Sequence, residues 1–192
     1  MYLFNINNGT IDLDAFTFRE HRRSDFITQR ANVKYDPDAK CPTWDEFMCK
    51  VLNNDIGLIR YVQKIVGYSL TADTGEQAMF LLDGPGANGK STFIRIIERL
   101  LGDYARHADA KTLLERKNPS HSGDLARLKG ARLVGANETE EYKKLSEAQI
   151  KTMTGSDKIV ARFLFCNEFE YAPTYKIFFS VNNLPVINAQ DP

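Results

Sequence analysis

Residues 79–101 read MFLLDGPGANGKSTFIRIIERLL and combine three patterns in a fixed order. An apolar run, 79–82, leads into a glycine-rich segment, 84–91. After that segment, apolar residues recur at the three- and four-residue spacing of one helix face. The stretch therefore predicts a buried strand, a loop, and a helix that begins at about Gly89.

The loop fills every position of the pattern GxxxxGK[ST], in which each residue type helps to hold a triphosphate. Glycines let successive backbone N–H groups turn toward phosphate oxygens, and the N-terminus of the following helix adds a positive end. Lys90 can reach the β- and γ-phosphates, and the Ser91 hydroxyl can ligate Mg²⁺. We therefore predict that a nucleotide such as ATP, with Mg²⁺, binds at Gly84, Pro85, Gly86, Ala87, Asn88, Gly89, Lys90, Ser91 and Thr92.

The composition is that of an ordinary soluble globular protein, with 43% hydrophobic and 26% charged residues. Lysine and arginine together (25) equal aspartate and glutamate (25), so any surface that binds nucleic acid must be local. Cys41, Cys49 and Cys166 lack CxxC spacing, which favours reduced thiols in a cytosolic compartment. No apolar run approaches the roughly 20 residues that span a bilayer. We expect an intracellular, cytoplasmic protein that makes no membrane contact.

The N-terminal third predicts a small α+β region. The Asn7-Asn8-Gly9 sequence lies between two short apolar runs and is a hairpin signal. Thr43-Trp44-Asp45-Glu46 has the form of a capping box, which predicts a helix start. A second helix is expected from about Asp55.

Apolar strand runs alternate with helical segments from residue 79 onward. This alternation predicts an α/β core with a parallel central sheet and helices on both faces. The polar, turn-rich stretch 69–75 suggests where the N-terminal region ends. We therefore expect an α+β region at 1–72 and a core at 73–192.

A second apolar run lies in residues 132–141, RLVGANETEE, and ends in carboxylates. It has the layout of a buried strand that delivers an acid to Mg²⁺ and to the attacking water. Glu138 is the first candidate for this acid, with Glu140 and Glu141 as alternates. A strand followed by an acidic helix start would give the same sequence. The phosphate loop favours the metal-binding interpretation, because Mg²⁺ needs a carboxylate besides Ser91.

A third apolar run, 175–181, ends in Asn182-Asn183-Leu184-Pro185. An amide at a strand tip beside the phosphate loop can hydrogen-bond the γ-phosphate or position the lytic water. Taken alone, the same residues would more simply form a turn. In company with the other two motifs, Asn182 is a candidate catalytic residue.

These motifs, in this order, resemble superfamily 3 helicases of the phage and plasmid primase-helicase type, which are related to the poxvirus primase-helicase. The resemblance covers nearly the whole chain and implies an AAA+-like P-loop NTPase core. It is carried by GPGANGKST (84–92), RLVGANETEE (132–141), KTMTGSDKIVARFL (151–164) and FFSVNNLP (178–185).

The resemblance implies an ATP-dependent DNA helicase or translocase of a phage, plasmid or prophage replication protein. It would act as a ring, typically a hexamer, on single-stranded or forked DNA. The family pattern assigns Lys90 and Ser91 to the triphosphate and Mg²⁺, Glu138 to the Walker B acid, and Asn182 to the sensor position. It also implies that a segment beyond Pro192 carries an arginine finger, so we expect a chain that is truncated at its C-terminus.

The resemblance further implies that Lys151, Lys158 and Arg162 face DNA. The residues support a local basic patch, because Lys143, Lys144, Lys151, Lys158 and Arg162 outnumber Glu147 and Asp157 in this segment. Strand alternation after Asp157 places Lys158 and Arg162 on one face. The opposite, packed face is expected to hold Ile159, Ala161 and Phe163.

The sequence departs from the family pattern at Gly135 and Asn137, where bulkier apolar residues are more usual. The expected hairpin tip, 165–168, lacks the basic residue often found there.

Two other functions fit the phosphate loop. A small-molecule kinase would need an arginine-rich lid, and no such cluster follows the loop. A nucleotide-gated assembly module with weak hydrolysis is the third hypothesis. Stimulation of ATPase activity by single-stranded DNA would separate the helicase from both.

Overall fold

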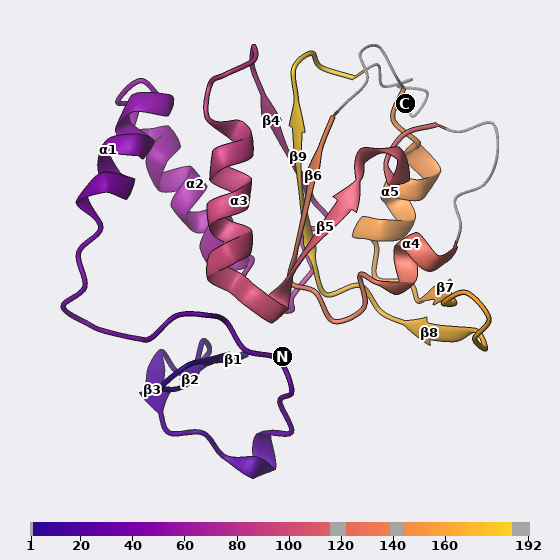
Figure 1. Cartoon of the computed structure of the whole chain (residues 1–192), viewed down its shortest axis with the longest axis horizontal. Helices are drawn as coiled ribbons and strands as arrows, with labels where there is room; N and C mark the ends of the chain where they lie inside the picture. The colour runs from indigo at the N-terminus through magenta and orange to yellow at the C-terminus, as the bar shows by residue number, and fades with distance from the viewer. Residues whose placement is uncertain (1, 116–121, 139–143, 186–192) are drawn as a thin grey trace.

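The computed structural model describes residues 2–115, 122–138 and 144–185, and a four-stranded parallel sheet forms its centre (Figure 1). The strand order is β4-β9-β6-β5. β9 lies between β4 and β6, and all six of its residues are buried. The predicted parallel α/β core is therefore confirmed. The strands are β4 (Met79–Asp83), β5 (Ala105–Asp109), β6 (Leu133–Asn137) and β9 (Lys176–Val181).

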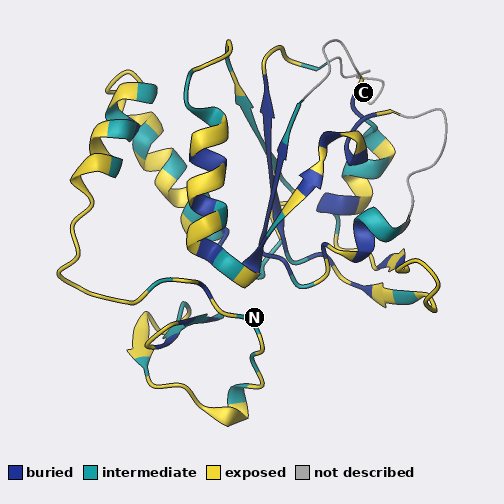
Figure 2. Ribbon diagram, in the orientation of Figure 1, coloured by how far each residue is buried: buried dark blue, intermediate teal, exposed yellow. Residues whose placement is uncertain are grey.

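Helices cover both faces of the sheet, as predicted (Figure 1). α3 (Lys90–Leu101) packs on one face, where its buried side chains meet Leu133 and Phe178. α4 (Ser122–Ala126) and α5 (Glu147–Thr154) lie on the other face, over Val134 and Phe179. The two faces separate cleanly because side chains alternate along a strand. The buried layers run along both sides of the sheet (Figure 2).

The N-terminal hairpin is confirmed: β1 (Leu3–Ile6) pairs antiparallel with β2 (Gly9–Asp12) around Asn7 and Asn8. A third strand, β3 (Thr17–Arg19), was not predicted. It leads into a 3-10 turn, η1 (Arg23–Asp25).

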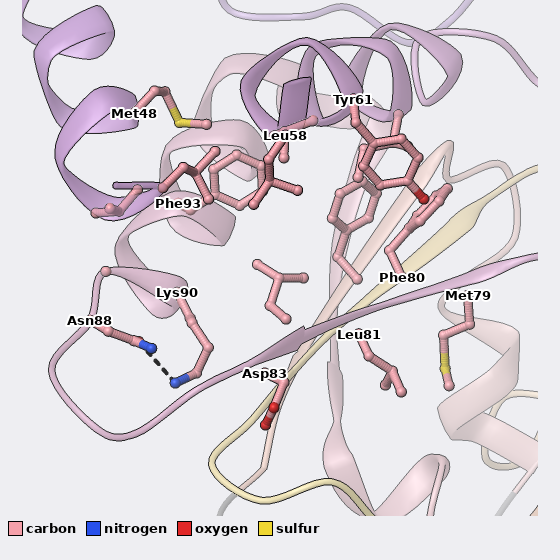
Figure 3. Close-up of a pocket in the computed structure, with 17 residues that line it drawn as sticks. Met48, Leu58, Tyr61, Met79, Phe80, Leu81, Asp83, Asn88, Lys90 and Phe93 are labelled. Atoms are coloured by element: carbon pink, nitrogen blue, oxygen red, sulfur yellow. Dashed lines mark hydrogen bonds between the residues drawn. The ribbon is translucent and has the colours of Figure 1, made fainter. Parts of the chain in front are cut away.

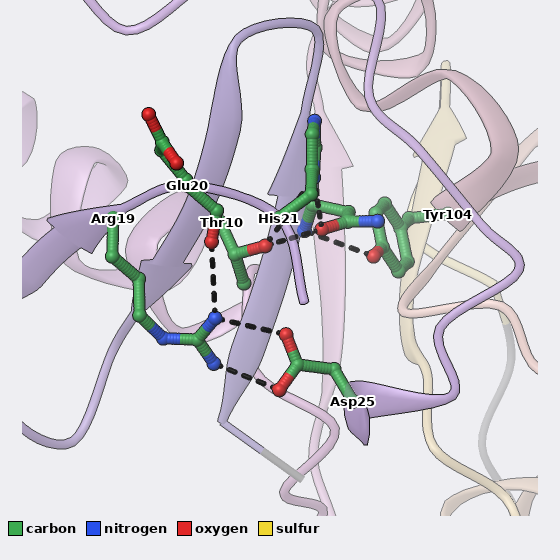
Figure 4. Close-up of polar contacts among 7 residues, drawn as sticks. Thr10, Arg19, Glu20, His21, Asp25 and Tyr104 are labelled. Carbon is green, nitrogen blue, oxygen red and sulfur yellow. Dashed lines mark hydrogen bonds and ion pairs between the residues drawn. The ribbon is translucent and has the colours of Figure 1, made fainter. Parts of the chain in front are cut away.

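The polar contacts of this region are drawn in Figure 4. Two hydrogen bonds of 2.9 Å join the Arg19 guanidinium to the Asp25 carboxylate, which lowers the pKa of that carboxyl group. On the other side of the hairpin, the Tyr104 hydroxyl accepts a hydrogen bond from the Asn5 backbone N–H at 3.1 Å. Tyr104 also stacks on Phe4, so one aromatic side chain contacts the hairpin through both a hydrogen bond and a ring.

The predicted capping box is wrong. α1 spans Pro42–Val51, and its N-cap, Cys41, makes no side-chain cap bond. Proline occupies the first helical position instead, where its missing N–H costs nothing and its fixed φ suits the helix. α2 (Ile56–Tyr68) starts as predicted, because the Asp55 carboxylate accepts a hydrogen bond from the Leu58 N–H at 3.0 Å.

The remaining described elements are short. Two 3-10 turns, η2 (Gly102–Tyr104) and η3 (Ala110–Thr112), flank β5. β7 (Ile159–Ala161) and β8 (Phe169–Tyr171) form an antiparallel hairpin between α5 and β9. No helix within the described ranges is long and apolar enough to cross a bilayer.

Two buried basic side chains join the N-terminal third to the sheet. The Arg132 guanidinium donates to the carbonyl oxygens of Leu3 and Leu70 and lies 4.4 Å from the Tyr104 ring centroid. The Lys176 amine donates to the carbonyl oxygens of Thr71, at 2.7 Å, and Asp73, at 3.0 Å. The boundary at residue 72 stays a prediction, since side chains from both sides of it share one buried cluster.

Burial of Lys176 should make the free energy of unfolding depend on pH. Burial, and then the charge of Arg132, lower its pKa from 10.5 to about 7. Between these values the unfolded chain holds a proton that the folded chain has released, so the free energy of unfolding rises with pH. The neutral amine keeps two N–H groups for its two carbonyl partners. We expect a slope of up to about 1.4 kcal/mol per pH unit from pH about 7 to about 10. Above that, burial of Tyr68 and Tyr104 raises their pKa values and reverses the trend.

Urea unfolding curves across this pH range measure the slope. Lys176→Met should flatten it, whereas Lys64→Met, at an exposed lysine on α2, should leave it unchanged. An unaltered slope in the Lys176 variant would show that another group carries the pH dependence.

Candidate active site

One pocket brings together the three predicted motifs. It has a volume of about 190 Å³ and lies at the carboxyl ends of β4, β6 and β9. Parallel strands place these ends along one edge of the sheet, where ligands of α/β proteins commonly bind. Residues 80 or more positions apart in the sequence therefore line the same cavity. The lining residues are Gly86, Ala87, Asn88, Gly89, Lys90, Ser91, Thr92, Asn137, Glu138, Ser180 and Asn182.

The loop between β4 and α3 has a backbone that demands glycine at two positions. Gly84 has φ +148° and Gly89 has φ +92°, both in the region that L side chains rarely adopt. A Cβ at Gly84 would collide with the side-chain amide of Asn88, and one at Gly89 would lie 2.8 Å from Cγ1 of Val51. The loop is therefore tightly folded and rests against α1.

Lys90 begins α3, and its ammonium group is held by the loop. It donates to the carbonyl oxygens of Gly84, at 2.5 Å, and Pro85, at 3.1 Å. A third hydrogen bond goes to Oδ1 of Asn88 at 2.9 Å, and Figure 3 shows the two side chains meeting. Gly84 and Pro85 thus contact Lys90 without lining the pocket themselves. A phosphate that reached this ammonium would replace neutral partners with a charged one, which forms stronger hydrogen bonds.

Glu138 and Asn182 lie side by side at the ends of two neighbouring strands. The Asn182 backbone N–H donates to Oε2 of Glu138 at 3.3 Å, and the Glu138 N–H donates to the Ser180 carbonyl oxygen at 2.8 Å. The Glu138 carboxylate is therefore hydrogen-bonded to the residue that follows β9. The alternate acids, Glu140 and Glu141, lie outside the described residues.

The sequence analysis proposed no site role for two of the lining residues, Asn137 and Ser180. Asn137 is the last residue of β6 and directly precedes Glu138. Ser180 is the last but one residue of β9, two positions before Asn182. Their position at the carboxyl edge was the available signal.

A second pocket, of about 330 Å³, adjoins the phosphate loop and was not predicted. It shares Asn88, Gly89 and Lys90 with the first pocket (Figure 3). Its other walls are mainly apolar side chains of α1, α2 and β4, with the aromatic ring of Tyr61 among them. A flat, largely apolar group could bind there while polar groups attached to it reached the loop.

The predicted DNA-facing residues lie away from these pockets. Lys158 and Arg162 are exposed at either end of β7, and the Lys158 ammonium is 3.1 Å from Oε2 of Glu170 on β8. Lys151 is exposed on α5, and Lys143 lies outside the described residues. Ile159 and Ala161 are buried as predicted.

The prediction for Phe163 is wrong, because its side chain is 48% exposed. β7 ends at Ala161, so the strand alternation does not extend to this residue. The hairpin tip that follows exposes two further apolar side chains, Leu164 and Phe165.

Two family descriptions match the chain. The family described as D5 N terminal like matches residues 1–53, and the family of unknown function DUF5906 matches residues 82–192, more than half of the chain.

Viral relatives match almost the full length of the chain. A protein of Acanthamoeba polyphaga mimivirus described as a putative helicase is 30% identical over 99% of this chain and 20% of its own length. A putative helicase of Invertebrate iridescent virus 3 is 26% identical over 96% of this chain and 21% of its own. A putative primase of African swine fever virus is 25% identical over 85% of this chain and 18% of its own length. The chain spans about a fifth of the length of these relatives.

Solved structures share the fold at low identity. An apo structure of the NrS-1 C-terminal region superposes with a TM-score of 0.62 at 13% identity, over 83% of this chain and 40% of that one. A second apo structure of that region superposes with a TM-score of 0.59 at 14% identity, over 84% of this chain and 37% of the other.

The sequence family, the viral relatives and the shared fold agree with one another. The chain therefore belongs to the family of unknown function DUF5906, and with its D5-like N-terminus it is of the viral primase-helicase type.

Proposed function

We propose that this chain is the ATP-binding and ATP-hydrolysing part of a DNA helicase of superfamily 3 with a P-loop NTPase fold. The observation that supports this most directly is the single pocket in which the phosphate loop meets Glu138 and Asn182. The helicase and primase relatives point to DNA as the partner. A virus-encoded protein of this type would work in the host cytoplasm, as a ring of six copies on single-stranded or forked DNA.

The loop would bind the triphosphate through its backbone N–H groups and the N-terminus of α3. Lys90 would exchange its carbonyl partners for phosphate oxygens. The Ser91 hydroxyl and the Glu138 carboxylate line the same pocket, and such oxygen ligands suit Mg²⁺. Bound there, Mg²⁺ would neutralise charge on the β- and γ-phosphates.

Hydrolysis needs a group that orients the attacking water. The Glu138 carboxylate accepts a hydrogen bond from the Asn182 N–H, which favours an orientation beside the tip of β9. Within the part of the chain that the structure describes, its second oxygen has no partner, and it could accept a proton or a hydrogen bond from water. The Asn182 side chain is the neighbouring group that could contact the γ-phosphate.

The larger pocket would take the nucleoside. It shares Asn88, Gly89 and Lys90 with the smaller pocket, and its apolar walls suit a planar base.

Two alternative functions can be distinguished from the helicase by experiment. A small-molecule kinase would transfer phosphate to an acceptor and ignore DNA. A nucleotide-gated assembly module would bind ATP and associate, with little turnover. ATPase activity stimulated by single-stranded DNA supports the helicase over both.

Lys90→Ala should abolish ATP hydrolysis with little effect on the fold, because it removes the cation that meets the β- and γ-phosphates. Glu138→Gln should bind ATP normally but hydrolyse it about 10²- to 10⁴-fold more slowly, as loss of a general base predicts. A fluorescent ATP analogue measures binding, and phosphate release measures turnover.

Lys64→Ala, at an exposed lysine on α2, is the matched control and should behave as wild type. Thermal unfolding checks that each variant is folded. Normal hydrolysis by the Glu138 variant would contradict the assignment, and a loss in Glu140→Gln would transfer the role to that residue.

The basic residues around β7 predict a salt-dependent DNA affinity. Non-specific binding to a single strand arises mainly from the release of counterions, and each phosphate contact contributes about 0.7 to the salt slope. Lys158→Gln with Arg162→Gln should therefore weaken binding and lower the slope by up to about 1.4 if both residues contact phosphates. Fluorescence anisotropy with an oligothymidine at several salt concentrations measures both quantities.

Neutralising Lys34 and Lys40, two exposed lysines between β3 and α1, is the charge-matched control. Basal ATPase should be unchanged in both double variants. Equal DNA affinity for the two would exclude the β7–β8 hairpin from the DNA path.

A further inference from the structure

A polar network crosses from α3 to the edge of the phosphate pocket. The Glu98 carboxylate, on α3, lies 2.8 Å from Nδ1 of His107 on β5. The other ring nitrogen, Nε2, lies 3.5 Å from the side-chain nitrogen of Asn137 at the end of β6. Asn137 lines the pocket and directly precedes Glu138. These three side chains thus connect α3, through β5, to the end of β6, which Glu138 directly follows.

Gly135 makes room for this network. It lies beside His107 in the parallel register of β5 and β6. A Cβ at this position would collide with the Glu98 carboxylate and lie 2.6 Å from Cγ2 of Ile94. Alternation along β6 places residues 133, 135 and 137 on the face that α3 covers. A bulkier residue at 135 would therefore push Glu98 away from His107.

When the His107 ring is neutral, the chemistry of the three side chains sets the direction of their hydrogen bonds. A carboxylate can only accept, so Nδ1 of His107 carries the proton that meets Glu98. In the neutral ring Nε2 is then an acceptor, and it takes a hydrogen bond from the Asn137 NH₂ group. The amide oxygen of Asn137 consequently points away from His107.

That oxygen is buried and has no hydrogen-bond partner within the part of the chain that the structure describes. A buried acceptor without a partner is destabilising, so most such atoms in proteins are hydrogen-bonded to protein or to ordered water. The Asn137 residue itself lines the pocket, together with Glu138 and residues 86–92. A donor that arrives with the nucleotide would satisfy the amide oxygen.

We propose that Glu98 and His107 are positioning residues, which hold the Asn137 amide with its oxygen ready to accept a hydrogen bond from a water molecule bound beside the triphosphate. This inference rests on the proposed ATPase function and adds three residues to it. Asn137 would help Glu138 to orient that water. Glu98 and His107 act only through Asn137.

Side-chain replacements in the full-length protein test the proposal. Asn137→Leu removes the oxygen and the NH₂ group of the side-chain amide and keeps a similar size. His107→Phe and Glu98→Leu remove the other two polar side chains of the network. Each should lower kcat about tenfold or more, as loss of one preorganised polar contact predicts, while changing nucleotide affinity much less. Glu98→Gln keeps an acceptor for Nδ1 and should retain most of the activity. His21→Phe, at a histidine that follows β3 and lies 3.2 Å from Oδ1 of Asn5, is the matched control.

Residues that act as one unit have non-additive effects. The double variant His107→Phe with Asn137→Leu should therefore be no slower than Asn137→Leu alone. Multiplied effects would overturn the proposal, as would wild-type kcat in variants that only unfold at lower temperature.

A readout independent of turnover comes from ¹⁵N spectra of the three histidines. His107, identified by its loss in His107→Phe, should carry its proton on Nδ1, and Glu98→Leu should disturb that tautomer. A proton on Nε2 in the wild-type protein would contradict the network. Absence of MgATP binding by wild type would defeat the proposed function and this inference together. Normal binding with wild-type kcat in the variants would defeat this inference alone.

Discussion

The parallel register of β4, β9 and β6 is the constraint on which the candidate site depends. Ser180 lies opposite both Leu82 and Asn137, so the chain leaves all three strands at the same level. The backbone hydrogen bonds of the sheet, together with the buried side chains of β9, hold this level fixed. A slip of one residue in β6 would turn its buried side chains to the opposite face. The distance between the phosphate loop and Glu138 is therefore set by sheet packing, and no local contact between the two is needed.

The sequence predicted those parts of the molecule that arise from local patterns. The strand, loop and helix at 79–101 form a continuous signal, and the Asn-Gly pair specifies its hairpin without help from distant residues. Errors occurred where a neighbour changes a local preference. Pro42 starts α1 before the predicted capping box, and the short length of β7 leaves Phe163 outside the strand. Glu98, His107 and Asn137 come from three separate elements, and only the folded sheet shows that they meet.

The N-terminal third does more than precede the sheet. It supplies the carbonyl groups that surround Arg132 and Lys176, and it supplies the helix on which the phosphate loop rests at Gly89. A buried cation such as Arg132 needs such partners, because removing a charge from water costs several kcal/mol. The carbonyls belong to β1 and to the segment after α2, so the two sequence regions are held together by polar groups at the sheet's amino edge. The loop at the opposite edge is supported by apolar contacts from α1.

Charge counted along the sequence is a poor measure of the surface that a nucleic acid would meet. The segment around β7 has an excess of basic residues, yet Lys158 is partly neutralised by Glu170 on the paired strand, a partner twelve positions away. An exposed pair of this kind contributes little to stability, and a phosphate can compete for its lysine. The lysine would exchange one anion for another, so its net contribution to DNA affinity is smaller than that of an unpaired cation at the same place. The effective charge of the hairpin is thus a property of both strands, and salt dependence reports it more directly than composition does.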